Sequence, residues 1–426
     1  MRSPVARHRQ HGAVIVTAAL VLLFLLGFMG IALDFGRLFI VKTELQTAMD
    51  SCALAAAQEL DSQGTAILRA QSAGKTAGNL NRVNMQSTNW SGQGQIVDAN
   101  ITFKNSAYAV TTVPASAHYA QCQHTQANIN MWLLKAMGAF SGNAAAYPGT
   151  QNVGAIAVAV RASAQTTCPV PVALKPKPGG TAPNYGFAVG EWVTLINAQN
   201  AAAGGEIGWA NLDGTNSASE TEAELNGHCG TRVGDTLGTP GVQTSVVDAW
   251  NYRFGIYKNN PNLAETKQNP DFTGYAYTAT NWPSQQNAYD GAPAAGAPAS
   301  AQNFVTKRAA FASCADTGTR VKNPAPSCES ITGLSLNSFQ KLAAPGNTTG
   351  GHKQYGRNRR IVTVPVINGA SQVIDYACMF MLQPLTIPMS NVKLEFRGNA
   401  GAANSPCTTN GLPGGAAGPL VPTLVR

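Results

Sequence analysis

Residues 12–60 read GAVIVTAALVLLFLLGFMGIALDFGRLFIVKTELQTAMDSCALAAAQEL, and the rest of the chain is organised around this stretch. Its first part, residues 13–33, carries no charged side chain, and Thr17 is its one polar side chain. About twenty apolar residues suffice to cross a hydrocarbon core of about 30 Å as a helix. In lipid, a helix pairs the backbone groups of a segment internally. The stretch therefore predicts a transmembrane helix.

The predicted helix continues past the membrane to about residue 60. Residues 34–60 contain no proline and one glycine, Gly36. Their apolar side chains recur every three or four residues, and this spacing produces one apolar seam on an otherwise polar rod. The seam consists of Leu38, Val41, Leu45, Ala48, Cys52 and Ala55. An unbroken helix of this length would measure about 70 Å, and its seam is a candidate surface for helix packing.

Two charged side chains follow the apolar run directly, at the predicted outer face of the membrane. Asp34 and Arg37 are one helical turn apart, so they either pair with each other or orient the helix against a partner in an assembly. Ala32 and Gly36 add a pair of small residues at a spacing that favours close helix packing. The candidate membrane-interface and assembly residues are Asp34, Gly36, Arg37, Leu38, Val41, Leu45 and Cys52.

The basic residues before the apolar run predict the orientation of the helix. Arg2, Arg7 and Arg9 precede it without any acidic residue, so the positive-inside rule places the N-terminus in the cytoplasm. Arg37 and Lys42 on the other side count against this orientation. The long remainder of the chain is then expected to be extracytoplasmic.

N-terminal processing is an open alternative. A cleaved signal peptide is disfavoured because the apolar run is long and the small residues at 53–57 come too late for a cleavage site. Prepilin-type processing after Gly12 would place Thr17 where pilins usually carry glutamate. The sequence therefore favours an intact anchor without deciding the matter.

The composition argues against a cytosolic enzyme. Charged residues make up 12% of the 426 residues, whereas 43 glycines and 24 prolines indicate a loop-rich, surface-type protein. The hydrophobic content of 44% is ample for one large domain or two. The net charge of +8 is modest for this length and includes the arginines before the membrane, so it does not predict nucleic-acid binding.

The stretch at residues 12–60 also carries a family resemblance. Gly12-Ala13, the long apolar run, the DFGR of residues 34–37, the LQTAMD of 45–50 and the ALAAA of 53–57 together resemble the N-terminal segment of TadG-like (TadE/TadG-type) proteins. These proteins belong to the Tad (Flp, tight-adherence) pilus-assembly system. Cys52 stands where that family usually has alanine.

A weaker resemblance to the same family covers residues 359–407, with RRIVTVPV, DYACMFML and LEFRG followed by Cys407. The resemblance implies a structural or assembly component of a Tad pilus in the bacterial inner membrane, with a cytoplasmic N-terminus and a periplasmic C-terminal region. It implies other pilus-assembly proteins, or a second copy bound through the helix seam, as partners. Many TadG-like proteins have an Asp-x-Ser-x-Ser adhesion signature, which this sequence lacks. A secreted or surface-displayed binding protein, released by N-terminal processing, is the alternative.

The remaining patterns predict an α+β fold with a loop-rich extracytoplasmic region and antiparallel strands. We expect a basic tail at 1–12, the transmembrane helix at 13–33, a helix extension with a small α+β region at 34–163, an α+β domain at 164–397 and a flexible tail at 398–426. The small region should contain a helix at 65–80, weakened by Gly74 and Gly78, strands at 101–112 and 154–160, and a helix at 128–140. The large domain should contain strands at 187–196, 361–366, 373–382 and 392–396 and short helices at 217–225, 245–252 and 302–312, with a Pro-rich linker at 168–183.

Eight cysteines without a CxxC pair predict disulfides outside the cytoplasm, although eight cysteines allow 105 pairings. Proximity favours Cys314 with Cys328 first, then Cys378 with Cys407 and Cys168 with Cys229. Cys52, on the helix seam, is a candidate for linking two copies of the protein.

No motif supports catalysis. His118, Cys122 and His124 have a spacing that could hold zinc with a water, but a polar connector whose Cys122 joins a disulfide is the favoured interpretation. Gly74-Lys75-Thr76 lacks the glycine that a phosphate-binding loop needs five positions earlier, where Arg69 stands. His228 beside Cys229 and the basic run at 352–360 are more typical of a turn and a solvated loop. We expect a non-enzyme without metal, cofactor, small-molecule substrate or nucleic acid.

Overall fold

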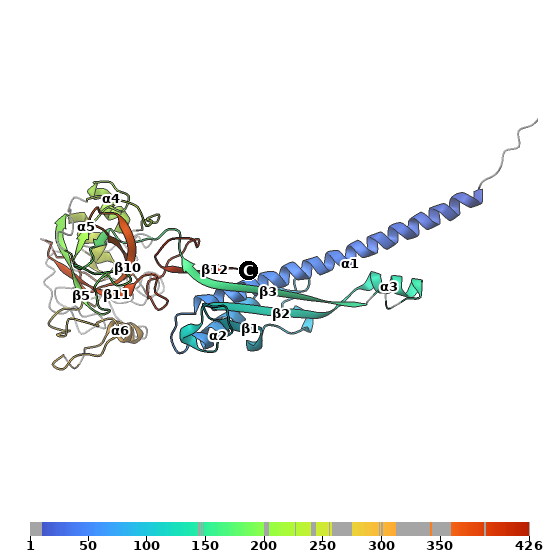
Figure 1. Ribbon diagram of the computed structural model, residues 1–426, viewed down its shortest axis with the longest axis horizontal. Coiled ribbons are helices and arrows are strands. Elements are labelled where there is room, and N and C mark those ends of the chain that lie inside the picture. The colour runs from blue at the N-terminus through green and yellow to red at the C-terminus, as the bar shows by residue number, and fades with distance from the viewer. Residues whose placement is uncertain are drawn as a thin grey trace, which may run out of the picture. The chain divides into compact units, whose positions relative to one another are not determined.

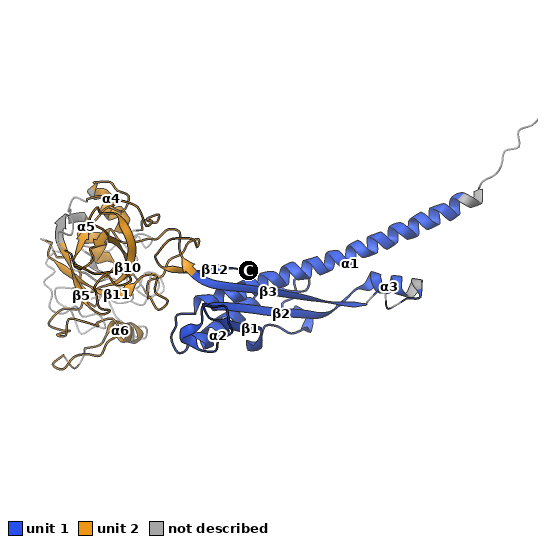
Figure 2. Cartoon of the chain, viewed as in Figure 1, with its two compact units in different colours: residues 1–161, 422–426 blue, residues 162–421 orange. Residues whose placement is uncertain are grey.

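The computed structural model describes residues 11–143, 145, 147, 149–199, 204–225, 227–239, 244–254, 256–257, 275–297, 299, 301–311, 341–342, 359–386 and 389–425. The chain forms two compact units (Figure 2). Unit 1 comprises Met1–Arg161 and Pro422–Arg426, and unit 2 comprises Ala162–Val421. Cys314, Cys328 and residues 352–358 of the basic run lie outside the described residues.

Unit 1 combines three helices with a four-stranded sheet (Figure 1). The helices are α1 (His11–Gln58), α2 (Ala66–Asn79) and α3 (Trp132–Ser141). The strands are β1 (Ile101–Lys104), β2 (Tyr119–Asn130), β3 (Thr150–Ser163) and β12 (Leu420–Leu424), in the order β1-β2-β3-β12. Three 3-10 turns, at Trp90–Gly92, Asp98–Asn100 and Pro114–Ser116, lie in the connections. The first half of α1 extends beyond the sheet.

The second half of α1 forms the core of unit 1. Its buried side chains from Val41 to Ala57, with Leu60 just beyond its end, pack in one cluster with α2 and with the inner faces of β1, β2 and β3. The helix is continuous because its sequence has no proline and is rich in leucine and alanine, which favour helix formation. Beyond its end, Glu59 and Asp61 both pair with Arg69 of α2, and these contacts hold the turn between the two helices.

Two glycines let α2 approach α1 closely. A Cβ built at Gly74 would lie 3.2 Å from the Ala56 Cβ, and one at Gly78 would lie 3.0 Å from the Cys52 Cβ. The sequence suggested that these glycines weaken the helix, and the structure shows what they contribute. Small residues four positions apart remove the side-chain bulk that would separate two packed helices.

Strand β2 is absent from the sequence-based prediction, which treated its region as a polar connector. The strand pairs antiparallel with β1 and β3. Its buried positions include Ala120, Cys122 and Gln126, alternating with more exposed ones. The alternation is present, but small and polar residues occupy the inner face, so β2 has no run of large apolar side chains.

Unit 2 is built around a closed six-stranded barrel in the order β10-β11-β5-β6-β4-β9. Its strands are β4 (Val172–Leu174), β5 (Trp192–Gln199), β6 (Ile207–Trp209), β9 (Ile361–Ile367), β10 (Val373–Met381) and β11 (Val392–Asn399). Most neighbours are antiparallel, whereas β5 with β6 and β4 with β9 are parallel. The short helices are α4 (Ala218–Leu225), α5 (Thr244–Tyr252) and α6 (Phe304–Phe311), and β7 (Ile256–Tyr257) pairs with β8 (Lys341–Leu342). The predicted α+β class with antiparallel strands is confirmed.

The prediction of a flexible tail at 398–426 is wrong for residues 398–425. Cys407 is bonded to Cys378 of β10, and the Val425 amide donates to the Val158 carbonyl at 2.9 Å. The glycines and prolines of this segment allow the turns of an ordered stretch of chain. Unit 2 is thus an insertion between β3 and β12 of the unit 1 sheet.

Candidate membrane-anchor and assembly site

The first half of α1 presents apolar side chains without covering them. Val14, Phe24 and Phe28 are 65%, 65% and 66% exposed, and the intervening large apolar residues are similarly exposed. By length and composition, α1 is a helix that can cross a membrane. A core helix of a water-soluble protein would bury such residues, so this exposure is typical of a segment that lipid covers.

Asp34, directly after the apolar run, caps another helix. Its carboxylate Oδ2 accepts the N–H groups of Leu133 at 2.9 Å and Leu134 at 2.7 Å, in the first turn of α3. Met131, the residue at the N-cap position of α3, offers no side-chain acceptor. Asp34 therefore supplies from α1 the acceptor that α3 lacks, and its negative charge matches the positive end of the α3 dipole.

Arg37 contacts the connection between β2 and α3 through its guanidinium group. Its Nη1 donates to the Asn130 carbonyl at 3.1 Å, and its guanidinium carbon lies 4.9 Å from the centre of the Trp132 ring. Within the described residues 11–143, no ion pair joins Arg37 to Asp34. The interpretation that these two residues pair with each other is therefore wrong, because both bind the β2–α3 connection.

The seam is occupied by the chain itself. Val41, Leu45 and Cys52 are fully buried in the unit 1 core, and Leu38 packs partly buried against it. These four residues therefore do not present a surface to a partner. The spacing correctly marked a packing face, but the partner is the chain's own α2 and sheet, because unit 1 folds back onto the same helix.

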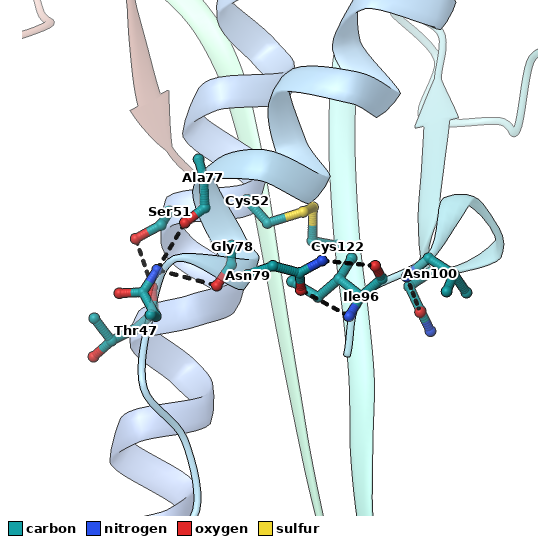
Figure 3. The surroundings of a disulfide bond; sticks show 11 residues. Thr47, Ser51, Cys52, Ala77, Gly78, Asn79, Ile96, Asn100 and Cys122 are labelled. Atoms are coloured by element: carbon teal, nitrogen blue, oxygen red, sulfur yellow. Dashed lines mark hydrogen bonds between the residues drawn. A yellow bond between two sulfur atoms is a disulfide. The ribbon is translucent and has the colours of Figure 1, made fainter. Parts of the chain in front are cut away.

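Cys52 is joined to Cys122 of β2 by a disulfide, which links α1 to the sheet (Figure 3). The bond lies beside Gly78 and Asn79 of α2, where the Asn79 side chain exchanges two hydrogen bonds with the backbone of Ile96. Cys52 is thus not a free thiol that could link two copies. Cys122 is likewise engaged, so it does not combine with His118 and His124 as a zinc ligand.

His124 occupies a packed position in the core region. Its ring meets the Trp90 ring edge-on with centroids 5.4 Å apart, and burial lowers its pKa. Among the described residues, no group of three or more His, Cys, Asp or Glu side chains could hold a metal ion.

The opposite side of α1 is open. We call Ala32, Phe35, Gly36, Phe39 and Ile40 the free face of α1, since they share one side of the helix and are turned away from the seam. Phe35, Phe39 and Ile40 are 47%, 68% and 46% exposed. Apart from the backbone of α1 itself, no described atom lies within 4 Å of a Cβ built at Gly36. The small-residue pair at 32 and 36 was the signal in the sequence that pointed to this face.

The described part of unit 2 contains two further disulfides. Cys168 is bonded to Cys229, and Cys378 is bonded to Cys407, the partners that proximity in the sequence favoured. None of the cysteines in the described part of the chain is free. Cys229 is therefore engaged in a bond and does not form a nucleophile pair with His228.

The exposed apolar helix and the three disulfides indicate a membrane-anchored, extracytoplasmic protein. The segment from residue 12 to residue 59 matches a protein-family model described as putative Flp pilus-assembly TadE/G-like. No curated protein and no solved structure matches the chain. The N-terminal resemblance is thus confirmed, whereas the weaker one at 359–407 stays a prediction.

Proposed function

We propose that this protein is a single-pass, non-catalytic structural component of a Tad (Flp) pilus-assembly system. In this proposal α1 anchors it in the bacterial inner membrane, with the N-terminus in the cytoplasm and both units in the periplasm. One observation carries the proposal: the matched segment, residues 12–59, coincides with α1 at His11–Gln58. The family-specific part of the chain is therefore one helix, of which one half is exposed and apolar and the other forms a core.

The free face of α1 is the surface that we propose for contacts with assembly partners. The seam is buried, so a neighbouring helix has access to Ala32, Gly36 and Phe39 instead. Small residues at this spacing allow close approach of a second helix within or near lipid. Phe39 comes after the charged residues Asp34 and Arg37, and a large exposed apolar side chain in this position is typical of a binding surface.

Site-specific photo-crosslinking tests the surface. A photoreactive amino acid replaces Phe39 in the full-length protein in its native membranes, and Leu45, which is fully buried, serves as the matched control position. We expect adducts from position 39 with a pilus-assembly protein or a second copy, identified by mass spectrometry. Adducts with lipid alone, or the same products from both positions, would overturn the assignment of the free face.

A functional test compares two open glycines. Gly36→Leu adds bulk to the free face, whereas Gly64→Leu adds it to the turn between α1 and α2, where a Cβ likewise meets no described atom within 4 Å. In a strain lacking the native gene, we expect Gly36→Leu to reduce pilus formation at unchanged protein level and Gly64→Leu to support it. Normal pili with both variants would contradict the proposed role of this face.

N-terminal sequencing of the mature protein distinguishes the proposal from a binding protein that is released by N-terminal processing. An N-terminus at or before Ala13 retains the whole apolar run and supports the anchor. A mature N-terminus beyond residue 33 would remove the membrane segment and favour the released form.

A further inference from the structure

Helix α3 lies beside the apolar half of α1. A Cβ built at Gly30 would lie 3.1 Å from the Leu133 Cβ, and one built at Gly27 would lie 3.7 Å from the Met137 Cε. Asp34 holds the first turn of α3. Moving forward along α3 therefore corresponds to moving backward along α1, so the two helices run antiparallel (Figure 1).

Because α3 lies beside α1, the neighbouring residues of α1 show at which depth of the membrane α3 would lie. The apolar run ends at Leu33, and Gly27 lies six residues before that end, or about 9 Å along a helix. Leu133 and Met137 are therefore level with the outer third of the apolar run. Trp132, at the start of α3, is level with Arg37, which lies four residues beyond the end of the apolar run.

The composition of α3 fits lipid better than water. Its ten residues read WLLKAMGAFS, with Lys135 as the one charged side chain. Trp132 is 68% and Leu133 40% exposed, and their exposure continues the exposed apolar surface of α1. Tryptophan is enriched where membranes meet water, and a lysine stem can run along apolar surface while its ammonium group reaches the headgroups.

The polar groups at the base of α3 are also satisfied within the protein. Asp34 is 6% exposed, and its carboxylate accepts two backbone N–H groups of α3. The Met131 amide donates to the Gly149 carbonyl at 2.9 Å, so the β2–β3 hairpin stays paired up to the residue that precedes α3. Unpaired backbone groups are costly next to lipid, and this connection leaves few of them.

We propose that α3 is a second membrane-contacting element, inserted into the outer leaflet of the bilayer that α1 spans. The occupant of its exposed apolar face is lipid, because this face is continuous with the apolar surface of α1. The inference rests on the proposed anchoring of α1. It adds that the β2–β3 hairpin also reaches the membrane and sets how far unit 1 stands from it.

Quenching of tryptophan fluorescence by brominated lipids tests the inference on the full-length protein in lipid nanodiscs. Bromines near the headgroup end of the acyl chains should quench wild type, and Trp132→Phe should lose that quenching. Trp90→Phe is the matched control, because Trp90 is fully buried in unit 1 and its removal should leave the quenching in place. Retention of the Cys52–Cys122 disulfide and of the far-UV circular dichroism spectrum checks that each variant folds. If Trp132→Phe fails this check, Trp132→Tyr takes its place as the variant without a tryptophan in α3.

A tryptophan placed in α1 separates the two proposals. Phe24→Trp in the Trp132→Phe background puts the probe near the middle of the apolar run, where bromines near the chain ends should quench it. If this probe is quenched and Trp132 is not, water or a protein partner covers α3, and the inference is overturned while the anchor stands. If the probe in α1 is not quenched, the anchor itself is wrong.

Discussion

Asp34 couples two segments that are about a hundred residues apart in the sequence. Its carboxylate on α1 accepts the first free N–H groups of α3 and lies almost fully buried between the two helices. The sequence indicated that Asp34 was special because it ends the apolar run. Its partner was not predictable, because the connection between β2 and α3 is brought to it only when the sheet folds against α1.

Replacing Asp34 by alanine should loosen the start of α3. Removal of a capping acceptor costs about 1 kcal/mol, so the Leu133 and Leu134 amides should exchange hydrogen for deuterium faster. Asp34→Asn keeps an acceptor oxygen and should have the smaller effect. Hydrogen exchange with mass spectrometry of the full-length protein in nanodiscs measures this, and equal exchange in wild type and Asp34→Ala would show that the cap does not hold α3.

The buried carboxyl group of Glu224 in α4 should make the stability of unit 2 depend on pH. Burial raises the pKa of Glu224 to about 7, although its Oε1 accepts the amides of Leu212 and Asp213. An unfolded glutamate titrates near 4.5. Between these values the folded state binds more protons than the unfolded state, so the free energy of unfolding falls as pH rises through this window.

The variant Glu224→Gln removes this titration while it keeps the oxygen that accepts the two amides. We expect wild type to lose on the order of 3 kcal/mol between pH 4.5 and pH 8, from a shift of about two units or slightly more, and the variant to lose correspondingly less. Thermal unfolding at several pH values measures the difference. Parallel pH profiles for the two proteins would rule out Glu224 as the group responsible.

At the level of elements, two helical glycines should respond in opposite ways. A Cβ at Gly78 would lie 2.3 Å from the Ile96 Cδ1 and 3.2 Å from the Ala48 carbonyl oxygen, so Gly78→Ala should force α2 away from α1 and destabilise by about 1–3 kcal/mol. Gly36→Ala meets open space and should stabilise the helix by about 1 kcal/mol. Denaturant unfolding in detergent measures both, and an unchanged or increased free energy of unfolding for Gly78→Ala would contradict the close α1–α2 contact.

The sequence predicted the elements that have strong patterns and missed those that depend on context. Helix α1 and strands β9, β10 and β11 have long apolar runs or clear periodicity, and they were found. Strand β2 was missed because alanine, cysteine and glutamine fill its inner face, and their burial depends on the helix that covers them. The seam was recognised, but periodicity cannot tell whether the covering partner lies in the same chain.

At the level of the whole molecule, unit 2 is an insertion whose two ends lie close together. The Ala164 amide donates to the Pro419 carbonyl at 3.1 Å, directly beyond the ends of β3 and β12. This closeness predicts that unit 1 can fold without unit 2. Replacing residues 165–418 by Asn-Gly, a pair that favours two-residue hairpin turns, should leave a protein that still forms the Cys52–Cys122 disulfide.

Mass analysis after alkylation, without reduction, reports that disulfide in the shortened protein, and hydrogen exchange reports β2 and β3. The control is the same deletion with Cys122→Ala, which cannot form the bond. Free, alkylated Cys52 and Cys122 in the shortened protein would show that unit 1 depends on unit 2.

The insertion also imposes an order on biogenesis. Strand β12 is synthesised only after residues 164–419, so the edge of β3 waits without its neighbour while all of unit 2 is translated and exported. An unpaired strand edge is a template for pairing with another chain. During export, this edge is therefore the place where two nascent copies would exchange strands, and a chaperone that shields one exposed β-strand would protect the protein until β12 pairs with β3.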